Sequence, residues 1–278
     1  MRADQLLVER GLAGSRSQAQ RLIAGGLQWR TVGDWRAVGK NGDDIPQTAE
    51  LRLLDLAQAR YVSRGGLKLE GALAATGLVP TGWTVLDVGQ STGGFTDCLL
   101  RQGARRVLGV DVGQGQLHAS LRADPRVLGL QGLNARQLTA TQLIAASQAA
   151  IRAGGQKHQK IWQALEDRFE LIVGDLSFIS LTLVLPVLRP LLKPSGHLLM
   201  LVKPQFELQP GQIGKGGIVR DASLYPLVEQ RLRDCCDRLA LGATDWLDSP
   251  IPGGDGNREF FIHARATGVP PSSGSETP

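Results

Sequence analysis

Cysteine is scarce in this chain of 278 residues: there are three, at positions 98, 235 and 236, and they form no Cys-x-x-Cys pair. Two adjacent cysteines do not easily bridge to each other, so the sequence contains no disulfide framework. Histidine is equally sparse, and no His-Glu-x-x-His or other ligand spacing occurs among His118, His158, His197 and His263. We therefore expect a reduced, cytoplasmic protein without a metal site.

Long apolar runs are also missing. The most apolar long window, residues 183–202, is broken by Arg189, Lys193 and three prolines, whereas a membrane span needs about 20 residues with few charges. The first residues, MRADQLLVERG, carry charges where a signal peptide would have an apolar core. The sequence thus predicts a soluble protein that is neither exported nor bound to a membrane.

The N-terminal segment predicts a small α+β module. A capping-box spacing, Ser15 followed by Gln18, marks the start of its second helix, and the glycines at 25 and 26 mark the end. The expected helices and strand-like runs cover residues 3–13, 15–24, 27–45 and 49–56.

Charge is unevenly distributed along the chain. The net charge is only +5, but the first 40 residues hold seven Lys or Arg against three Asp or Glu. A basic excess suits a polyanionic partner such as RNA, although a solvated helix face explains it about as well. The side chains that could bind phosphates in this segment are Arg10, Arg16, Arg21 and Arg30.

From residue 84 onward, strand-like and helix-like runs alternate, which predicts an α/β fold with a mostly parallel, Rossmann-like sheet. The strand-like runs are 84–89, 106–113, 170–177, 197–205, 243–249 and 258–266, and the helix-like runs are 93–104, 181–196 and 225–242. Only PIPGGDGN separates the last two strands, so we expect an antiparallel hairpin at one edge, an ending typical of methyltransferases.

These patterns predict a domain organisation. A small N-terminal domain is expected first, then a linker, then the α/β domain with a helical insertion, and finally a disordered tail. The expected ranges are 1–59, 60–66, 67–265 with the insertion at 141–168, and 266–278.

A glycine-rich loop, GQSTGG at residues 89–94, follows the first strand of the α/β domain. Ligands of doubly wound sheets bind beyond the carboxyl ends of the strands, where this loop falls. A dinucleotide motif would have glycine in place of Ser91, and a P-loop would need a lysine that does not follow. S-adenosylmethionine has no phosphate, and backbone groups of such a loop suit its amino-acid end.

Two aspartates end neighbouring strands on either side of this loop. Asp87 can order the loop or reach the amine of the ligand, and Asp111 is placed to accept both ribose hydroxyls. NAD enzymes use an acidic residue in the same way, and ordinary strand-end aspartates would give the same pattern.

Further charges stand where other strands reach the same edge. Asp175 ends the fourth strand, Lys203 ends the fifth, and Glu259 begins the final antiparallel strand. Lys68 precedes the sheet, on a segment that could form a helix closing the same face. Each residue alone could be a surface charge, but together they predict a catalytic group.

Two sets of motifs carry resemblances to known families. QLLVERGLAGSRSQAQRLIAGGLQ, at residues 5–28, resembles an S4-like RNA-binding domain, whereas WRTVGDWRAVGKNGDD after it departs from that pattern. YVSRGGLKLEGAL, DVGQSTGGFTDCLL, VDVGQGQL, LNARQLT, DLSFISL, LVKPQFE and GNREFF are similar, in sequence and order, to the TlyA family, sometimes labelled hemolysins. Gln90 is a departure, because the family usually carries a smaller residue there.

The TlyA resemblance implies an FtsJ-like domain that uses S-adenosylmethionine to methylate a cytidine ribose 2′-hydroxyl in ribosomal RNA, free or within a ribosomal subunit. Lys203 would face the 2′-oxygen as a base or as a positioner, with Lys68 as the neighbouring cation that favours loss of its proton. The implied catalytic residues are Lys68, Asp175, Lys203 and Glu259. The implied cofactor contacts are Asp87, Gly89, Ser91, Thr92, Gly93, Gly94, Phe95, Thr96, Asp111, Val112, Asn134 and Asp175, and the RNA contacts are Arg10, Arg16, Arg21 and Arg64.

Three alternatives stay open. The first is an RNA-binding protein that retains a methyltransferase fold without catalysis, against which the four charged positions argue. The second is a membrane-lytic hemolysin, which no amphipathic or apolar segment supports. The third is an NAD-dependent oxidoreductase, which Ser91 disfavours.

Overall fold

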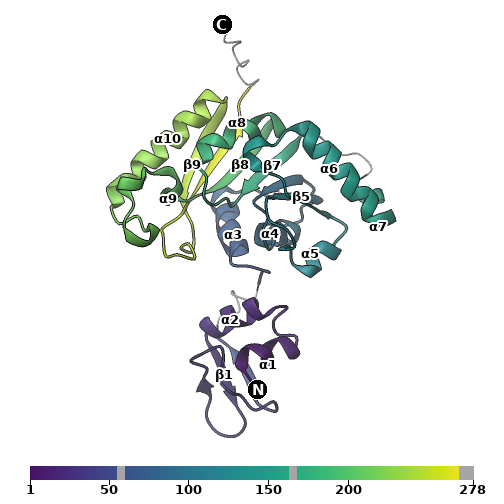
Figure 1. Cartoon of the computed structure of the whole chain (residues 1–278), viewed down its shortest axis with the longest axis vertical. Helices are drawn as coiled ribbons and strands as arrows, with labels where there is room; N and C mark the ends of the chain where they lie inside the picture. The colour runs from purple at the N-terminus through teal and green to yellow at the C-terminus, as the bar shows by residue number, and fades with distance from the viewer. Residues whose placement is uncertain (55–59, 163–167, 269–278) are drawn as a thin grey trace. The chain divides into compact units, whose positions relative to one another are not determined.

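The computed structural model describes residues 1–54, 60–162 and 168–268, and the chain divides into two compact units, Met1–Leu67 and Lys68–Pro278 (Figure 1). Parts of three predictions lie outside the described residues: the end of the strand-like run 49–56, the end of the insertion 141–168, and the tail from residue 269.

The N-terminal unit combines two helices with a three-stranded antiparallel sheet of order β2-β1-β3. Leu6, Leu22 and Leu27 are buried in its own small core. The elements are α1 (Ala3–Glu9), α2 (Arg16–Ala24), β1 (Leu27–Arg30), β2 (Arg36–Ala37) and β3 (Glu50–Leu53).

Helix α1 is shorter than the predicted run 3–13. It ends early because Gly11 takes a left-handed backbone conformation with φ of 69°, which closes the last turn. Helix α2 follows the prediction: the Ser15 hydroxyl accepts a hydrogen bond from the Gln18 amide at 3.2 Å, and the helix ends before the two glycines.

The C-terminal unit is built on a seven-stranded sheet of order β6-β5-β4-β7-β8-β10-β9. The first five strands of that order are parallel, and β10 is antiparallel to both β8 and β9. The strands are β4 (Thr84–Val88), β5 (Arg106–Asp111), β6 (Val127–Gln131), β7 (Phe169–Gly174), β8 (Leu192–Val202), β9 (Leu241–Asp248) and β10 (Phe260–Ala266). The predicted α/β fold with an antiparallel ending is confirmed.

Helices cover both faces of this sheet (Figure 1). On one side lie α3 (Gly65–Thr76), α4 (Gly94–Arg101) and α5 (Ala119–Ala123), and on the other lie α6 (Ala140–Ala153), α8 (Leu185–Leu188) and α10 (Tyr225–Arg238). Every residue of β4 is buried, as expected of a parallel strand between two helix layers. Leu86 and Ile172 of the central strands share one core with Leu188 and Leu232 of the helices.

The predicted helix over residues 181–196 is wrong. The chain there forms a 3-10 turn, Leu181–Leu183, then the short α8, then a second 3-10 turn, Arg189–Leu191, and it then enters β8. Pro186 stands in the first turn of α8, and Pro190 stands in the first turn of the second 3-10 turn. Proline is tolerated there, but it cannot stand in the interior of one continuous helix.

Strand β6, which the sequence analysis did not single out, forms one edge of the sheet. The chain between β6 and β7 forms α6, which begins one residue before the predicted insertion 141–168, and α7 (Gly155–Ile161). A capping box of Thr139 and Gln142 begins α6, which packs on β6 and buries Leu143 in the main core. Helix α6 therefore supplies the crossover that two parallel strands require.

The strand ends that matter for function lie together at the carboxyl-terminal edge of the parallel strands. The parallel strands β4, β5, β7 and β8 all finish there, and β10 starts there, with Phe260 paired to Val202. The next residues after β7 and β8 are Asp175 and Lys203, and the last residue before β10 is Glu259. The fold thus brings residues from distant parts of the chain to one place.

Candidate active site

The glycine-rich loop leaves β4 with its backbone pressed against the end of β7. Gly89 has φ of 82°, and a Cβ there would lie 2.6 Å from the carbonyl oxygen of Asp175. The Asp175 amide donates to the Val88 carbonyl at 3.1 Å. Only glycine allows this approach, and Gly93, with φ of 95°, then begins α4.

Ser91 takes the left-handed conformation, with φ of 47°, at the position where a dinucleotide motif has its second glycine. Its amide donates to Asp111 Oδ2 at 2.8 Å. The other carboxylate oxygen of Asp111 accepts from the Gly113 amide at 2.7 Å. Asp111 therefore ties the loop to the end of β5, and each of its oxygens keeps a lone pair for a further donor.

Asp87 lies inside the domain, with 1% of its surface exposed. Its Oδ2 accepts from Thr96 Oγ1 at 2.6 Å, whereas its Oδ1 is buried without a hydrogen-bond partner among the described residues. Burial raises the pKa of Asp87 to about 7; the Thr96 hydrogen bond opposes the rise, and the charges of Asp175 and Asp111 add to it. Of the two roles predicted for Asp87, these contacts support the ordering of the loop.

Gln90 is buried beneath the same loop. Its side-chain nitrogen donates to Thr96 Oγ1 at 2.9 Å, so Gln90, Thr96 and Asp87 form one buried hydrogen-bonded chain. A Cβ at Gly109 would lie 2.0 Å from Gln90 Cδ, and a Cβ at Gly129 would lie 3.0 Å from Gln90 Oε1. A large side chain fits at position 90 because β5 and β6 carry glycine next to it.

The four predicted catalytic residues form two ion pairs. Lys68 of α3 donates to Glu259 Oε2 at 2.5 Å, and their side chains are only 7% and 3% exposed. Lys203 Nζ lies 2.6 Å from Asp175 Oδ1, an ion pair without the alignment of a hydrogen bond, and donates to Ser177 Oγ at 2.8 Å. The side chains of Lys203 and Asp175 are 13% and 27% exposed, so this outer pair reaches solvent.

The two pairs act on each other electrostatically. Burial raises the pKa of Glu259, while its hydrogen bond and ion pair with Lys68 oppose the rise. The charge of Lys203 also lowers this pKa and that of Asp175 raises it. The inner pair, Lys68 and Glu259, therefore lies within electrostatic range of the outer pair.

The loop between β9 and β10 holds Glu259 in place. Asn257 is buried, accepts from the Val219 amide at 2.9 Å and donates to the Gly217 carbonyl at 3.0 Å. A Cβ at Gly253 would lie 2.7 Å from Glu259 Oε1, so the loop packs closely around the carboxylate. The sequence analysis passed over Asn257, although it stands in the GNREFF motif.

Phe178 is a second residue that the sequence analysis passed over. Its side chain is 88% exposed, and its backbone has φ of 64°, which is rare for a large residue. The ring packs against Phe206, with centroids 5.0 Å apart. Phe178 follows Ser177, the partner of Lys203, so an exposed aromatic ring lies close along the chain to the outer ion pair. Its exposure carries no signal in the sequence.

The remaining predicted cofactor residues divide into two groups. Thr92, Val112 and Asn134 lie at the sheet edge, where Val112 is 66% exposed and Asn134 caps a short 3-10 turn. Phe95 and Thr96 are buried in α4, and Phe95 stacks on a phenylalanine of β10 with centroids 6.1 Å apart. The side chains of the second group face the core.

Two of the arginines expected to bind RNA make contacts within the N-terminal unit. Arg10 donates to the carbonyls of Gln47 and Ala49. Arg16 donates at 3.0 Å to Asp4, a carboxylate with no exposed surface. Their first role is therefore structural.

Arg21 and Arg64 are arranged differently. Arg21 donates to the Val62 carbonyl at 3.0 Å, but its Nε is buried without a partner among the described residues. Burial and the neighbouring charge of Arg64 lower the pKa of Arg21. Two adjacent cations of this kind suit an anionic partner.

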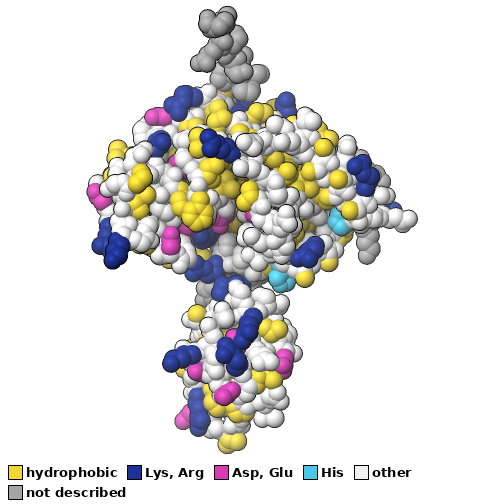
Figure 2. All heavy atoms as spheres, in the orientation of Figure 1, with side chains coloured by type: hydrophobic (Ala, Val, Ile, Leu, Met, Phe, Trp, Pro, Cys, Tyr) yellow, Lys and Arg dark blue, Asp and Glu magenta, His cyan; other side chains and the backbone are white. Residues whose placement is uncertain are grey.

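An aromatic and basic cluster lies on the small sheet. The guanidinium carbons of Arg30 and Arg52 lie 4.7 and 4.5 Å from the ring centroid of Trp35. Figure 2 shows that basic side chains are spaced among acidic and hydrophobic ones on the visible face of this unit, and form no single block. Aromatic rings with arginines are common in RNA-binding surfaces.

Comparison with known proteins decides the family. The model of the FtsJ-like methyltransferase family matches residues 61–266. The 16S/23S rRNA (cytidine-2′-O)-methyltransferase TlyA of Mycobacterium tuberculosis is 39% identical over 264 residues, which cover 95% of this chain and 89% of the relative. This chain belongs to the TlyA family of FtsJ-like methyltransferases.

Two further relatives agree with this assignment. The 23S rRNA (cytidine-2′-O)-methyltransferase TlyA of Campylobacter jejuni is 31% identical over 224 residues, covering 80% of this chain and 78% of the relative. A solved structure described as a hemolysin from Streptococcus thermophilus has a TM-score of 0.68 and 37% identity, covering 97% of this chain and 90% of that one. The predicted TlyA resemblance and the class of S-adenosylmethionine-dependent methyltransferase are confirmed, whereas the S4-like assignment stays a prediction.

Within residues 1–54, 60–162 and 168–268, no helix is both long and apolar enough to cross a bilayer.

Proposed function

We propose that this protein transfers the methyl group of S-adenosylmethionine to the 2′-hydroxyl of a cytidine ribose in ribosomal RNA, in the cytoplasm. The observation that carries the proposal is the ion pair of Lys203 and Asp175, which is partly exposed to solvent beside the glycine-rich loop of a TlyA-family sheet.

The residues around the loop fit this cofactor. Gly89 lets the loop pack directly on the Asp175 backbone at the end of β7, and Asp111 keeps free lone pairs that suit the two ribose hydroxyls. Asp87 has a buried oxygen without a hydrogen-bond partner in the described part of the chain, which suits a cation or another donor. When bound, S-adenosylmethionine supplies a methyl group that is already electrophilic.

Lys203 is our candidate for the residue that contacts the 2′-oxygen. Its ammonium is held between Asp175 and Ser177, which fixes its position at the sheet edge. From there it can hold the hydroxyl in line for attack or, once neutral, accept its proton. Asp175 orients the ammonium, and Ser177 limits its rotation.

Lys68 and Glu259 form the inner layer of the site. Both are too deeply buried to meet a nucleotide in this structure, so we assign them a positioning role behind Lys203 and Asp175. A fixed pair of opposite charges keeps the local potential constant when RNA displaces water from the outer pair.

Phe178 supports a nucleic-acid substrate. RNA modification enzymes stack an unpaired base on an aromatic ring, because a paired base hides its ribose from the active site. Phe178 offers an exposed ring in a strained conformation next to the partner of Lys203. We assign it the stacking of the target base or a neighbour.

The experiment that tests this function measures methyl transfer from labelled S-adenosylmethionine to purified ribosomal subunits, followed by mapping of 2′-O-methylcytidine. Lys203→Ala abolishes transfer but leaves cofactor binding by calorimetry unchanged. Phe178→Ala raises the KM for RNA and leaves the cofactor Kd unchanged. Loss of cofactor binding in Lys203→Ala would contradict its role, and RNA binding without any methylation by the natural chain would favour the non-catalytic alternative.

A further inference from the structure

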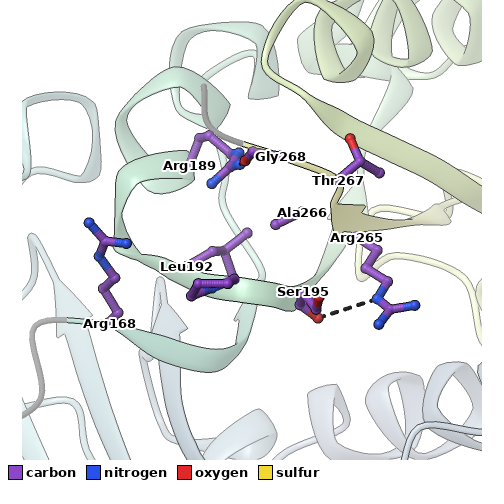
Figure 3. A pocket seen from close by; sticks show the side chains of 9 residues that line it. Arg168, Arg189, Leu192, Ser195, Arg265, Ala266, Thr267 and Gly268 are labelled. Atoms are coloured by element: carbon purple, nitrogen blue, oxygen red, sulfur yellow. Dashed lines mark hydrogen bonds between the residues drawn. The ribbon is translucent and has the colours of Figure 1, made fainter. Parts of the chain in front are cut away.

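A cavity of about 800 Å³ opens at the edge of the sheet opposite the active site (Figure 3). Its walls come from the start of β7, the start of β8 and the end of β10. The lining residues include Arg168, Arg189, Leu192, Ser195, Arg265 and Gly268. The straight part of β8, residues 197–202, separates this cavity from Lys203 by roughly 17 Å at 3.3 Å per residue, so the two sites are distinct.

A bulge in β8 shapes the cavity. Phe169 pairs with Leu192, but Leu171, only two residues further along β7, pairs with His197. The extra residues of β8 therefore loop out of the sheet, and Ser195 among them takes φ of 60°. A bulge of this size re-aims the chain and leaves room beside the strand.

Arg189 is a buried cation without a carboxylate partner in the described part of the chain. It is 4% exposed, and its Nε donates to the Leu239 carbonyl at 3.0 Å while one terminal nitrogen donates to the Gly268 carbonyl. The other terminal nitrogen has no partner in those residues. Neutral carbonyls satisfy hydrogen bonds but leave the charge of a buried guanidinium uncompensated.

Two further arginines add to this charge. Burial and the neighbouring charge of Arg168 lower the pKa of Arg189, so the two guanidinium groups repel each other. Among the described residues, Arg265 makes a single, long hydrogen bond of 3.4 Å, to the Ser195 carbonyl at the other side of the cavity. Figure 3 shows the three arginines around the cavity, with Arg189 beside Gly268. No acidic residue lines the cavity in the described chain.

We propose that this cavity binds the phosphate group of a nucleotide, either free or within RNA. Three guanidinium groups that have no counter-ion among the described residues favour an anion, and arginine forks match the oxygens of phosphate. The volume exceeds that of phosphate alone and lies in the range of small-molecule sites, so the ligand carries more than the phosphate. The proposal does not depend on the proposed methyl transfer.

The test uses the full chain saturated with S-adenosylhomocysteine, so that adenine nucleotides cannot enter the glycine-rich loop. Calorimetry measures binding of pyrophosphate and ADP, and filter binding measures a ribosomal RNA fragment at several salt concentrations. The variant is Arg168→Gln/Arg265→Gln, because both side chains are exposed and their loss spares the buried Arg189. Arg152→Gln, an exposed arginine on α6, is the matched control.

A free nucleotide is supported if the natural chain binds ADP more tightly than pyrophosphate. In that case the double variant should bind ADP roughly tenfold or more weakly, and the control should bind it as the natural chain does. Weakened RNA binding with no detectable ADP binding supports an RNA phosphate. Equal binding of all probes by the natural chain and the double variant would overturn the proposal. Lys203→Ala should keep the cavity's affinity, so failure of the proposed methyl transfer is distinguishable from failure here.

Discussion

The side chain of Gln90 occupies the space that a Cβ at position 109 would need, because such an atom would lie 2.0 Å from Gln90 Cδ. The two residues are a matched pair, one large and one small, on the loop and on β5. Gln90 also joins the buried chain through Thr96 to Asp87. The residue at which this sequence departs from its family is therefore fitted into the core below the cofactor loop.

Gly109→Ala should destabilise the protein by about 1–3 kcal/mol, because the new methyl group overlaps the Gln90 side chain. Gln90→Ala removes that obstacle, so the double variant Gln90→Ala/Gly109→Ala should be more stable than Gly109→Ala alone. Urea unfolding of the two single variants and the double variant measures this coupling. Additive losses would show that the two positions do not compete for space.

Asp87→Asn should change how stability depends on pH. The pKa of Asp87 is raised from 3.8 to about 7 on folding, so between these values the folded chain holds a proton that the unfolded chain releases. The contribution of Asp87 to stability is therefore present at acid pH and is lost as the pH rises towards 7. Asparagine has the same shape as aspartate and can still accept the hydrogen bond from Thr96, but it does not titrate.

At pH 8 we expect the free energy of unfolding of Asp87→Asn to exceed that of the natural chain by up to about 4 kcal/mol. Between pH 4 and pH 7 the free energy of unfolding of the variant should depend less on pH. Urea unfolding at several pH values measures both, and Asp97→Asn, a buried aspartate of α4 that is paired with Arg101, is the control. Parallel profiles for Asp87→Asn and the natural chain would show that Asp87 does not hold this proton.

Lys68→Met should cost about 3–5 kcal/mol of stability, because it leaves the Glu259 carboxylate buried without its partner. Lys68→Met/Glu259→Gln removes the second charge as well and should recover much of the loss. If the pair only supported the fold, the double variant would also recover methylation. We expect kcat to stay low, since the potential behind Lys203 is gone, with the KM for RNA little changed.

We expect Arg21 and Arg64 to make the RNA contacts of the N-terminal unit. Arg21→Gln/Arg64→Gln should weaken binding to a ribosomal RNA fragment and reduce the salt slope by about 1 for each lost phosphate contact. Arg16→Gln should instead lower the free energy of unfolding, because Asp4 loses a partner. Filter binding at several salt concentrations, with urea unfolding in parallel, separates the two effects.

Trp35→Ala is the informative control for this prediction. A larger loss of RNA affinity with Trp35→Ala than with the double arginine variant would place the RNA on the outer face of the small sheet instead.

Much of the site could be predicted because it depends on strand ends. Once alternating strands and helices are recognised, the carboxyl ends of parallel strands must meet, and Asp87, Asp111, Asp175 and Lys203 were placed at one edge on that ground alone. The misassigned run 181–196 shows the limit of the same method. Apolar residues there suit a helix or a buried strand equally, and only packing decides between them.

The sequence did not indicate which charged side chains pair with each other or which of them are buried. Lys68 and Glu259 are 191 residues apart, and nothing local indicates that they form the inner, buried pair while Lys203 and Asp175 form the outer one. The exposure of Phe178 and the charge left on Arg189 are also set by residues far away in the chain.

The sequence by itself determined the alternation of elements, the glycine positions of the loop and the family, because these depend on neighbouring residues and on motifs of fixed spacing. Only the tertiary structure decided which charges are neutralised, which are buried and which face a ligand. The reason is physical: the strength of a charge–charge contact and the cost of burial depend on distances through space, which separation along the chain does not determine.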